Sequence, residues 1–283
     1  MPEGPEVETI RASLAPLLVG RVIGAAWVSR KPLRSPLVAR ALTPLRGRVV
    51  VATGRRGKAM WIEVEGGAGL MVRLGMTGRL LVEPAAQEPV VHTHVRLGLG
   101  DTDELRFVDP RRFGSVVPFA GAAARAALLA DVGPDAISWD DAGRDAAARA
   151  LRATSRALKV ALLDQRLLAG VGNIYASEAL FRARLSPFAL GTDLDEGAAR
   201  RLLLAVEETL ADAVRNRGTS FSDFVDARGA RGDHRAHLQV YDRQGEACAS
   251  CGGRIRSQTQ GQRSTFWCPR CQPARRRVAA ALR

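Results

Sequence analysis

The chain of 283 residues carries 42 Lys and Arg against 29 Asp and Glu, a formal net charge of +13 at pH 7. Such a basic balance is typical of proteins that bind polyanions, so nucleic acid is the expected partner. No apolar run approaches the roughly 20 residues of a membrane span, and no secretory signal opens the chain, so we expect a cytoplasmic, nucleoid-associated protein with no membrane partner.

The chain opens with MPEGPEVETIR, in which Glu3, Glu6 and Glu8 stand around two prolines. Pro5 fits the first turn of a helix, where its missing N–H costs nothing, and carboxylates in that turn suit the helix dipole. The sequence therefore predicts a helix start here. A helix start does not explain why Pro2 and Glu3 precede it.

From about residue 20 to 120 the apolar residues recur with a period of two, as in KAMWIEVE and ELRFVDPRRFG, and Gly and Asp separate the runs. This pattern predicts antiparallel strands in a sandwich or a barrel. Only three lysines occur in the whole chain, at positions 31, 58 and 159. A lysine kept against so many arginines is a candidate for chemistry that needs a readily lost proton.

Two turns in this region carry unusual side chains. RLGMTGRL places Met76 between glycines, and DPRRFG places Arg111, Arg112 and Phe113 in a second turn. Each set taken alone is compatible with ordinary core or turn residues. Together, in so basic a chain, they favour an apolar wedge of the kind that enters a kinked DNA duplex.

After a break near residue 135 the period becomes helical, from about 141 to 216, with apolar residues such as Leu202, Val206 and Leu210 at helical spacing. Within it, LLDQRLLAGVGNIYASEALF predicts two helical stretches joined by residues 169–172. The glycines there would let the backbone approach a DNA phosphate beside Asn173. An ordinary helical hairpin explains the same stretch equally well.

The only cysteines are Cys248, Cys251, Cys268 and Cys271, two C-x2-C pairs separated by sixteen residues. The spacing is typical of a structural Zn²⁺ site with four thiolates and no open coordination position. Between the pairs the sequence predicts two short strands around Gly261, with Arg263 near the exposed end of the hairpin. We therefore expect domains at 1–135, 136–237 and 238–272, followed by a basic tail at 273–283.

These motifs, with RRGKA and LQVYDRQGEAC, follow one another in the order found in the formamidopyrimidine-DNA glycosylase and endonuclease VIII family, which the chain resembles from Met1 to about Cys271. GVGNIYASE, LGMTG and DPRRFG resemble the formamidopyrimidine branch. The resemblance implies a multidomain α+β fold: an N-terminal antiparallel β-sandwich with an N-terminal helix, a helix-two-turn-helix domain and a C-terminal β-hairpin zinc finger. It also implies a monomeric DNA glycosylase and abasic-site lyase that removes oxidised purines such as 8-oxoguanine from double-stranded DNA.

The resemblance gives roles to particular residues of this chain. Pro2, once Met1 is removed, would be the amine nucleophile, Glu3 the proton donor to the sugar, and Glu6 a positioning group. Lys58 and Arg263 would bind phosphate and assist β- and δ-elimination. The residues that would contact DNA are Met76, His92, Arg111, Arg112, Phe113 and Asn173, of which Met76, Arg111 and Phe113 form the wedge. Glu178 would support the amine.

One stretch departs from the family pattern, because DARGARGDHRAHLQVY has Asp233 and His234 where an aromatic residue is expected. This stretch is expected to close over the flipped base, so the departure leaves the preferred lesion open. Two alternatives remain: an endonuclease VIII-like glycosylase for oxidised pyrimidines, and a noncatalytic protein that binds damaged DNA. A pure binder has no reason to keep Pro2 and Glu3 at the extreme N-terminus.

Overall fold

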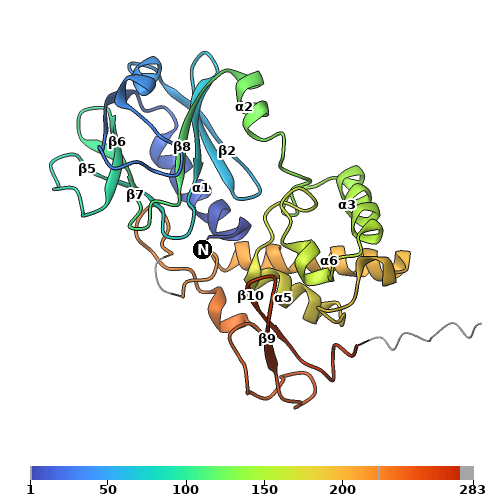
Figure 1. Cartoon of the computed structure of the whole chain (residues 1–283). Coiled ribbons are helices and arrows are strands. Elements are labelled where there is room, and N and C mark those ends of the chain that lie inside the picture. Colours follow the sequence, from blue (N-terminus) through green and yellow to red (C-terminus); the bar gives the residue numbers. More distant parts are fainter. Residues whose placement is uncertain (1, 222–223, 275–283) are drawn as a thin grey trace, which may run out of the picture. The chain divides into compact units, whose positions relative to one another are not determined.

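The computed structural model describes residues 2–221 and 224–274 (Figure 1). Met1 and most of the expected basic tail, residues 275–283, lie outside the described residues. The described chain forms two compact units, one made of 2–132 and 212–236 and the other of 133–211 and 237–274.

The first unit is a β-sandwich with a helix at its N-terminus (Figure 1). The helix is α1 (Gly4–Leu18). One antiparallel sheet has the strand order β1 (Ile23–Val28), β6 (Thr93–Leu99), β7 (Asp103–Val108) and β5 (Arg79–Pro84). The other has the order β2 (Val50–Arg56), β3 (Ala59–Val64), β4 (Ala68–Arg73) and β8 (Ser115–Ala120). The short helices are η1 (Ala39–Leu45) and α2 (Ala122–Leu128).

The core of this unit lies between the two sheets. Leu70 and Val72 of β4 pack in the same buried cluster as Leu105 and Phe107 of β7. Alternate residues of a strand point to opposite faces, so the period-two pattern in the sequence supplies one apolar face to each sheet. Helix α1 adds four buried residues at helical spacing to the same core: Val7, Ile10, Leu14 and Leu18.

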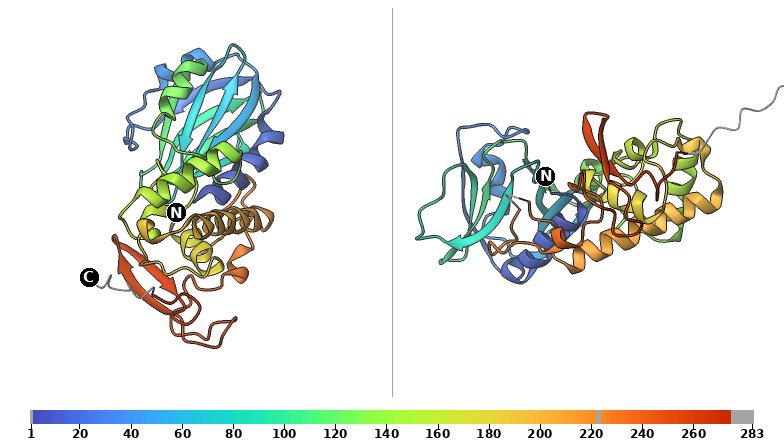
Figure 2. Two further views of the ribbon diagram at one scale, coloured as in Figure 1. Left: turned by 90° about the vertical axis from the view of Figure 1, so that its right-hand side faces the viewer. Right: turned by 90° about the horizontal axis from the view of Figure 1, so that it is seen from below.

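The second unit is mainly helical and ends in the cysteine-bearing hairpin. Its helices are α3 (Asp141–Ala153), α4 (Leu158–Leu162), α5 (Asn173–Arg182), η2 (Gly191–Asp193) and most of α6 (Glu196–Arg215). The last residues of α6 and the first three of η3 (His234–His237) belong to the first unit. Strands β9 (Arg256–Gln260) and β10 (Arg263–Trp267) form the hairpin, drawn in red in Figure 2. The predicted helical spacing is confirmed, because Leu202, Val206 and Leu210 are buried.

One local prediction is wrong. The helix before the glycine-rich turn ends at Leu162, so the connection to α5 runs over residues 163–172 rather than 169–172. The side chain of Gln165 pairs with the backbone of this connection: its amide donates to Leu163 O (3.1 Å) and Val171 O (2.8 Å), and its oxygen accepts from Gly170 N (3.1 Å). A side chain that pairs with nearby backbone stabilises turns in place of helix.

The architecture expected from the sequence is otherwise confirmed: an α+β chain with a β-sandwich, a helical region and a cysteine-bearing hairpin. Among the described residues, no helix combines the length and apolar character that crossing a membrane demands.

Candidate functional site

The N-terminal segment is held by the carboxylate of Glu6. Pro2 and Glu3 are buried, and Glu3 occupies the position just before helix α1. One oxygen of Glu6 accepts a hydrogen bond from Glu3 N (2.8 Å) and the other from Thr219 N (2.7 Å). A Cβ at Gly218 would lie 2.9 Å from Glu6 Oε1, and its φ is +78°, so only glycine lets that loop approach so closely. Glu6 therefore fixes the residue beside Pro2 to a loop some 210 residues away in sequence.

Glu8 has a different function from its two neighbours. It forms ion pairs with Arg11 (2.6 Å) and Arg55 of strand β2 (3.0 Å). Burial raises the pKa of Glu8, but hydrogen bonds from Arg11 and Arg55 outweigh burial and hold that pKa below its ordinary value. The third carboxylate of the opening thus fastens α1 to the sheet.

Lys58 lies in the tight turn between β2 and β3. Arg56 and Ala59 pair across it, and φ is positive at Gly57 only, the pattern of a two-residue turn with glycine first. Arg55 Nη1 donates to Gly57 O (2.9 Å) while its Nε donates to Glu8 (3.0 Å). Because the Arg55 guanidinium binds both Gly57 of the turn and Glu8 of α1, it connects the Lys58 turn to that helix.

The candidate wedge residues lie in two adjacent turns. Met76 is partly exposed between β4 and β5, and Arg111, Arg112 and Phe113 are exposed between β7 and β8. The Arg111 guanidinium lies 4.7 Å from the centre of the Phe113 ring. The sequence thus correctly identified two turns that present these side chains in one unit, although Met76 is less exposed than a turn tip implies.

His92 is exposed in the loop before β6, in the left-handed region at φ +71°, and its carbonyl accepts from Asp109 N (3.0 Å). The neighbouring His94 is buried. Its Nε2 donates to Asp109 O (3.1 Å), and its Nδ1 lies 2.9 Å from Ser29 Oγ. Burial lowers the pKa of His94, which favours the neutral ring. Of the two histidines, only His92 is placed to contact a ligand.

Asn173 is the first residue of α5 and joins that helix to the hairpin. Its amide nitrogen donates to Ser264 O (3.0 Å), and its oxygen accepts from Lys159 Nζ (2.8 Å). Lys159 is fully buried. The residue after Arg263 is therefore tied directly to the start of α5.

Arg263 is exposed at the start of β10. It pairs with Gln260 across a two-residue turn, and both turn residues, Gly261 and Gln262, have positive φ. This is the pattern of a type I′ turn, whose twist suits a hairpin. The predicted turn at Gly261 is confirmed, and it presents Arg263 at the tip.

Glu178 lies on α5, and its carboxylate accepts hydrogen bonds from Gln239 N (2.8 Å), Val240 N (3.0 Å) and Tyr241 N (2.8 Å). Burial raises the pKa of Glu178, opposed by these three bonds. Support of the terminal amine, the role that the resemblance implies for Glu178, stays a prediction, and the three hydrogen bonds serve a structural purpose. They anchor the segment that leads into the hairpin.

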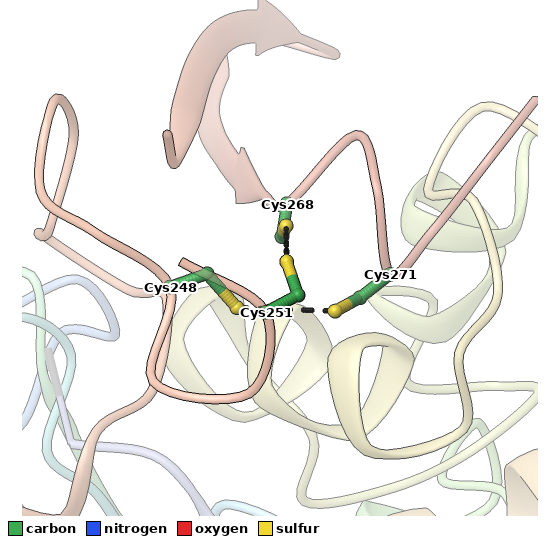
Figure 3. A group of neighbouring side chains, drawn as sticks. All are labelled: Cys248, Cys251, Cys268 and Cys271. Carbon is green, nitrogen blue, oxygen red and sulfur yellow. Dashed lines mark hydrogen bonds between the residues drawn. The ribbon is translucent and has the colours of Figure 1, made fainter. Parts of the chain in front are cut away.

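The four cysteines converge on one point (Figure 3). All four sulfur atoms lie within 4.8 Å of one another, with Cys248 and Cys271 separated by 3.8 Å and Cys251 and Cys268 by 3.5 Å. Sulfurs bound to tetrahedral zinc at about 2.3 Å lie about 3.8 Å apart, so the cluster fits one structural Zn²⁺. Four protein thiolates leave no coordination position for substrate.

The stretch that departs from the family pattern is locally ordered by polar contacts. Asp233 pairs with Arg217 (2.7 Å), and His234 is buried with its Nδ1 3.2 Å from the Asn216 amide. Gly232 N donates to Ser220 Oγ (2.9 Å). His234 therefore fills a buried position with a hydrogen-bonded ring instead of a purely apolar one.

Several residues of these sites were not identified from the sequence. Asp109 and Thr77 organise the two candidate wedge turns, and Lys159 holds Asn173. The scarcity of lysine was a usable signal for Lys159. The bond between Thr77 and Asp109 joins two different loops, so no local pattern in the sequence marks it.

Comparison with known proteins identifies the family. Residues 1–116, 132–225 and 245–274 match, in turn, the formamidopyrimidine-DNA glycosylase N-terminal domain, the H2TH domain of that enzyme, and the zinc finger found in FPG and IleRS. The formamidopyrimidine-DNA glycosylase of Xanthomonas campestris pv. campestris (strain 8004) is 41% identical over 272 residues, covering 96% of this chain and all of the relative.

Two solved structures agree. The complex of Lactococcus lactis Fpg with DNA containing an abasic site has a TM-score of 0.88 and 29% identity, and MutM bound to DNA containing carbocyclic 8-oxo-G has a TM-score of 0.86 and 28% identity. Each match covers 96% of this chain and all of the other. With three family domains in order and full-length relatives, the chain belongs to the formamidopyrimidine-DNA glycosylase family of base excision repair enzymes.

Proposed function

We propose that this protein is a bifunctional DNA glycosylase and abasic-site lyase that excises oxidised purines through its N-terminal proline. The observation that carries the proposal is the pair Pro2 and Glu3, buried at the start of α1 with Glu6 accepting from Glu3 N. Removal of Met1 makes Pro2 a terminal secondary amine. An α-amino group titrates near pH ~7.7 to 8.0, so a useful fraction is the free base in the cell.

Excision begins when the Pro2 nitrogen attacks C1′ of the damaged nucleotide. The C1′–N bond to the base breaks, and the base leaves with that electron pair and takes up a proton. Glu3 donates a proton to the ring oxygen O4′ as the sugar opens, and the amine nitrogen, after losing its own proton, forms a C1′ iminium. Glu6 positions Glu3 through the backbone bond at 2.8 Å.

Strand cleavage follows from the same iminium. It acidifies the C2′ proton, whose loss expels the 3′ phosphate, and a second elimination expels the 5′ phosphate. We assign Lys58 to phosphate binding and proton transfer in the first step, and Arg263 to phosphate binding in the second. The brace from Arg55 to the Lys58 turn and the exposed tip at Arg263 support these roles.

The remaining candidate residues would bind and deform the duplex. Met76, Arg111 and Phe113 would fill the space left by the flipped base, while His92, Arg112 and Asn173 would contact the backbone. We propose residues 1–135 as the catalytic domain, 136–237 as the helix-two-turn-helix domain and 238–272 as the zinc finger. Zinc would stabilise the hairpin when bound and supply no chemistry.

Oxidised purines are the proposed substrates because the relatives are named for formamidopyrimidine, and one solved relative holds an 8-oxo-G analogue. The departure of Asp233 and His234 from the family pattern supports a second candidate, an endonuclease VIII-like glycosylase for oxidised pyrimidines. Flipped bases are distinguished by contacts in the pocket that receives them. A change in that loop is therefore expected to alter which lesions are preferred more than it alters the excision and strand-cleavage reactions.

A cleavage assay on matched duplexes tests the proposal. The set holds 8-oxoguanine opposite cytosine, a formamidopyrimidine, an oxidised pyrimidine, an abasic site and an undamaged control. We expect purine lesions and the abasic site to be cut, and Pro2→Gly to lose most of that activity. If only the pyrimidine lesion is cut, the substrates are oxidised pyrimidines and not purines. If the protein binds the duplexes but cuts none, it is a noncatalytic protein that binds damaged DNA.

A further inference from the structure

Asp109, at the end of β7, joins three loops of the first unit. The residue is fully buried, and its backbone N–H donates to His92 O (3.0 Å). Its backbone carbonyl accepts from His94 Nε2 (3.1 Å) and from Arg112 N (3.2 Å). The backbone of Asp109 thus fixes the loop that presents His92 beside the turn that carries Arg112.

The side chain of Asp109 connects the two candidate wedge turns. Its Oδ1 accepts from Thr77 Oγ1 (2.5 Å) and from Arg111 N (3.3 Å), while its Oδ2 accepts from Gly114 N (2.8 Å). The Thr77 hydroxyl also accepts from Arg111 N (3.2 Å). The Thr77 hydroxyl therefore donates one hydrogen bond and accepts another, and both bonds connect its turn to the segment that begins at Asp109.

The two turns also touch through their backbones. A Cβ at Gly75 would lie 2.6 Å from Gly114 N and from the carbonyl carbon of Phe113, and φ of Gly75 is +63°. A Cβ at Gly114 would lie 2.8 Å from Arg73 O. Only glycine permits this approach, so the turns have one close-packed arrangement, which the Thr77 and Asp109 bonds hold.

This arrangement presents side chains that the free protein does not bury. Phe113 is 46% exposed with the Arg111 guanidinium over its ring, and Met76 is partly exposed in the adjoining turn. Base unstacking costs a few kcal/mol per step, so an inserted wedge works best when its parts are already in place. A surrounding hydrogen-bond network keeps such wedge side chains rigid.

We propose that Thr77 and Asp109 are positioning residues that hold the Met76 turn and the Arg111–Phe113 turn as one preformed wedge for opening the duplex. This inference rests on the proposed function, because the wedge acts on DNA. Neither residue touches the reacting sugar. Their loss should impair the opening of a stacked duplex and spare chemistry on a substrate that needs no opening.

Position 77 offers a matched set of variants. Thr77→Val keeps the shape of the side chain and removes the hydroxyl, whereas Thr77→Ser keeps the hydroxyl. Thr102→Val is the control, since Thr102 is exposed and its hydroxyl contacts only its neighbour Asp103 (3.2 Å) among the described residues. Melting temperature is recorded for every variant, so that loss of folding is separated from loss of positioning.

Two readouts are compared for each variant. The first is kcat/KM for cleavage of an 8-oxoguanine duplex and of a single-stranded oligonucleotide with one abasic site. For Thr77→Val we expect a loss of about tenfold or more on the duplex, since a misplacement of ~1 Å can cost about 100-fold. We expect wild-type rates on the single strand, and Thr77→Ser within about twofold of wild type on both.

The second readout is the fluorescence of 2-aminopurine next to the lesion, which rises when the stack opens and needs no catalysis. Thr77→Val should reduce that rise, and Thr77→Ser should restore it. Equal rises and equal duplex rates for wild type and Thr77→Val would overturn the inference, as would equal losses on both substrates with a lowered melting temperature. If the wild-type protein opens the duplex but cuts no substrate, the proposed function is wrong. The inference about Thr77 and Asp109 is then tested by the fluorescence of the variants alone.

Discussion

Pro2 and Arg263 are both candidate reaction-site residues at the start of a secondary-structure element, yet different chemistry holds each of them. Pro2 precedes α1, where carboxylates do the holding: Glu6 accepts from Glu3 N and Thr219 N, and Glu8 pairs with Arg55. Arg263 begins β10, in a hairpin packed with a buried cluster that includes Cys248, Cys268 and Cys271.

The two sites should therefore fail under different treatments. Hydrogen bonds to carboxylates weaken when the carboxylates are protonated or replaced, and a zinc-stabilised hairpin loosens when the metal is removed. Each prediction below acts on one side of that contrast.

The largest expected effect comes from Glu3→Gln. An amide cannot donate the proton that opens the sugar, and general acid catalysis contributes about 100-fold or more. We expect single-turnover cleavage of an 8-oxoguanine duplex to fall by that factor, with duplex affinity kept. Glu65→Gln, a change at an exposed turn, is the control. Wild-type cleavage by Glu3→Gln would remove Glu3 from the chemistry.

Lys58→Ala should have the next largest effect, a reduction in lesion cleavage of about tenfold or more, because the turn loses its proton donor and phosphate contact. The control is Lys31→Ala, which removes an exposed lysine from the same unit. Cleavage is followed on denaturing gels, with free base measured separately. Equal cleavage by the two variants would count against Lys58.

Removing zinc acts on the other side of the contrast. A chelator should reduce duplex affinity by about tenfold, since the hairpin that presents Arg263 loses its support. Hydrogen exchange should speed up in β9 and β10 and stay unchanged in α1 and β2. Wild-type affinity in the metal-free protein would show that the hairpin holds without the metal.

Glu8→Gln should have the smallest effect on the reaction and a clear one on stability. The pKa of Glu8 is lowered in the folded state, so its ion pairs stabilise the fold above the unfolded pKa and cease to do so as pH falls through the folded value. We expect a loss of about 2 kcal/mol at pH 7 in urea unfolding. The difference from wild type should shrink below about pH 4, and a difference independent of pH would contradict the assignment.

The sequence predicted what local patterns determine. Alternating apolar residues predicted the strands, Pro5 with the acidic first turn predicted α1, and the spacing of Cys248, Cys251, Cys268 and Cys271 predicted the cluster. Each of these signals lies within a few dozen residues, where one physical requirement fixes both the residue type and its position.

Contacts between distant segments were beyond such reasoning. The bond from Thr219 to Glu6, the three amides that meet Glu178 and the link from Thr77 to Asp109 depend on which loops the fold brings together. Gln165 shows the same limit on a short scale, because its side chain binds the backbone of the connection between α4 and α5. The spacing of apolar residues predicts neither the contacts between distant segments nor the hydrogen bonds of Gln165.

Borohydride trapping on an 8-oxoguanine duplex and an abasic duplex shows whether the Pro2 nitrogen carries the reaction. Borohydride reduces an iminium to a stable amine, and peptide mapping of the adduct locates the bond. We predict an adduct on Pro2, with Met1 absent, for both duplexes. No adduct on either duplex, or an adduct mapped to a lysine, would contradict that role for Pro2.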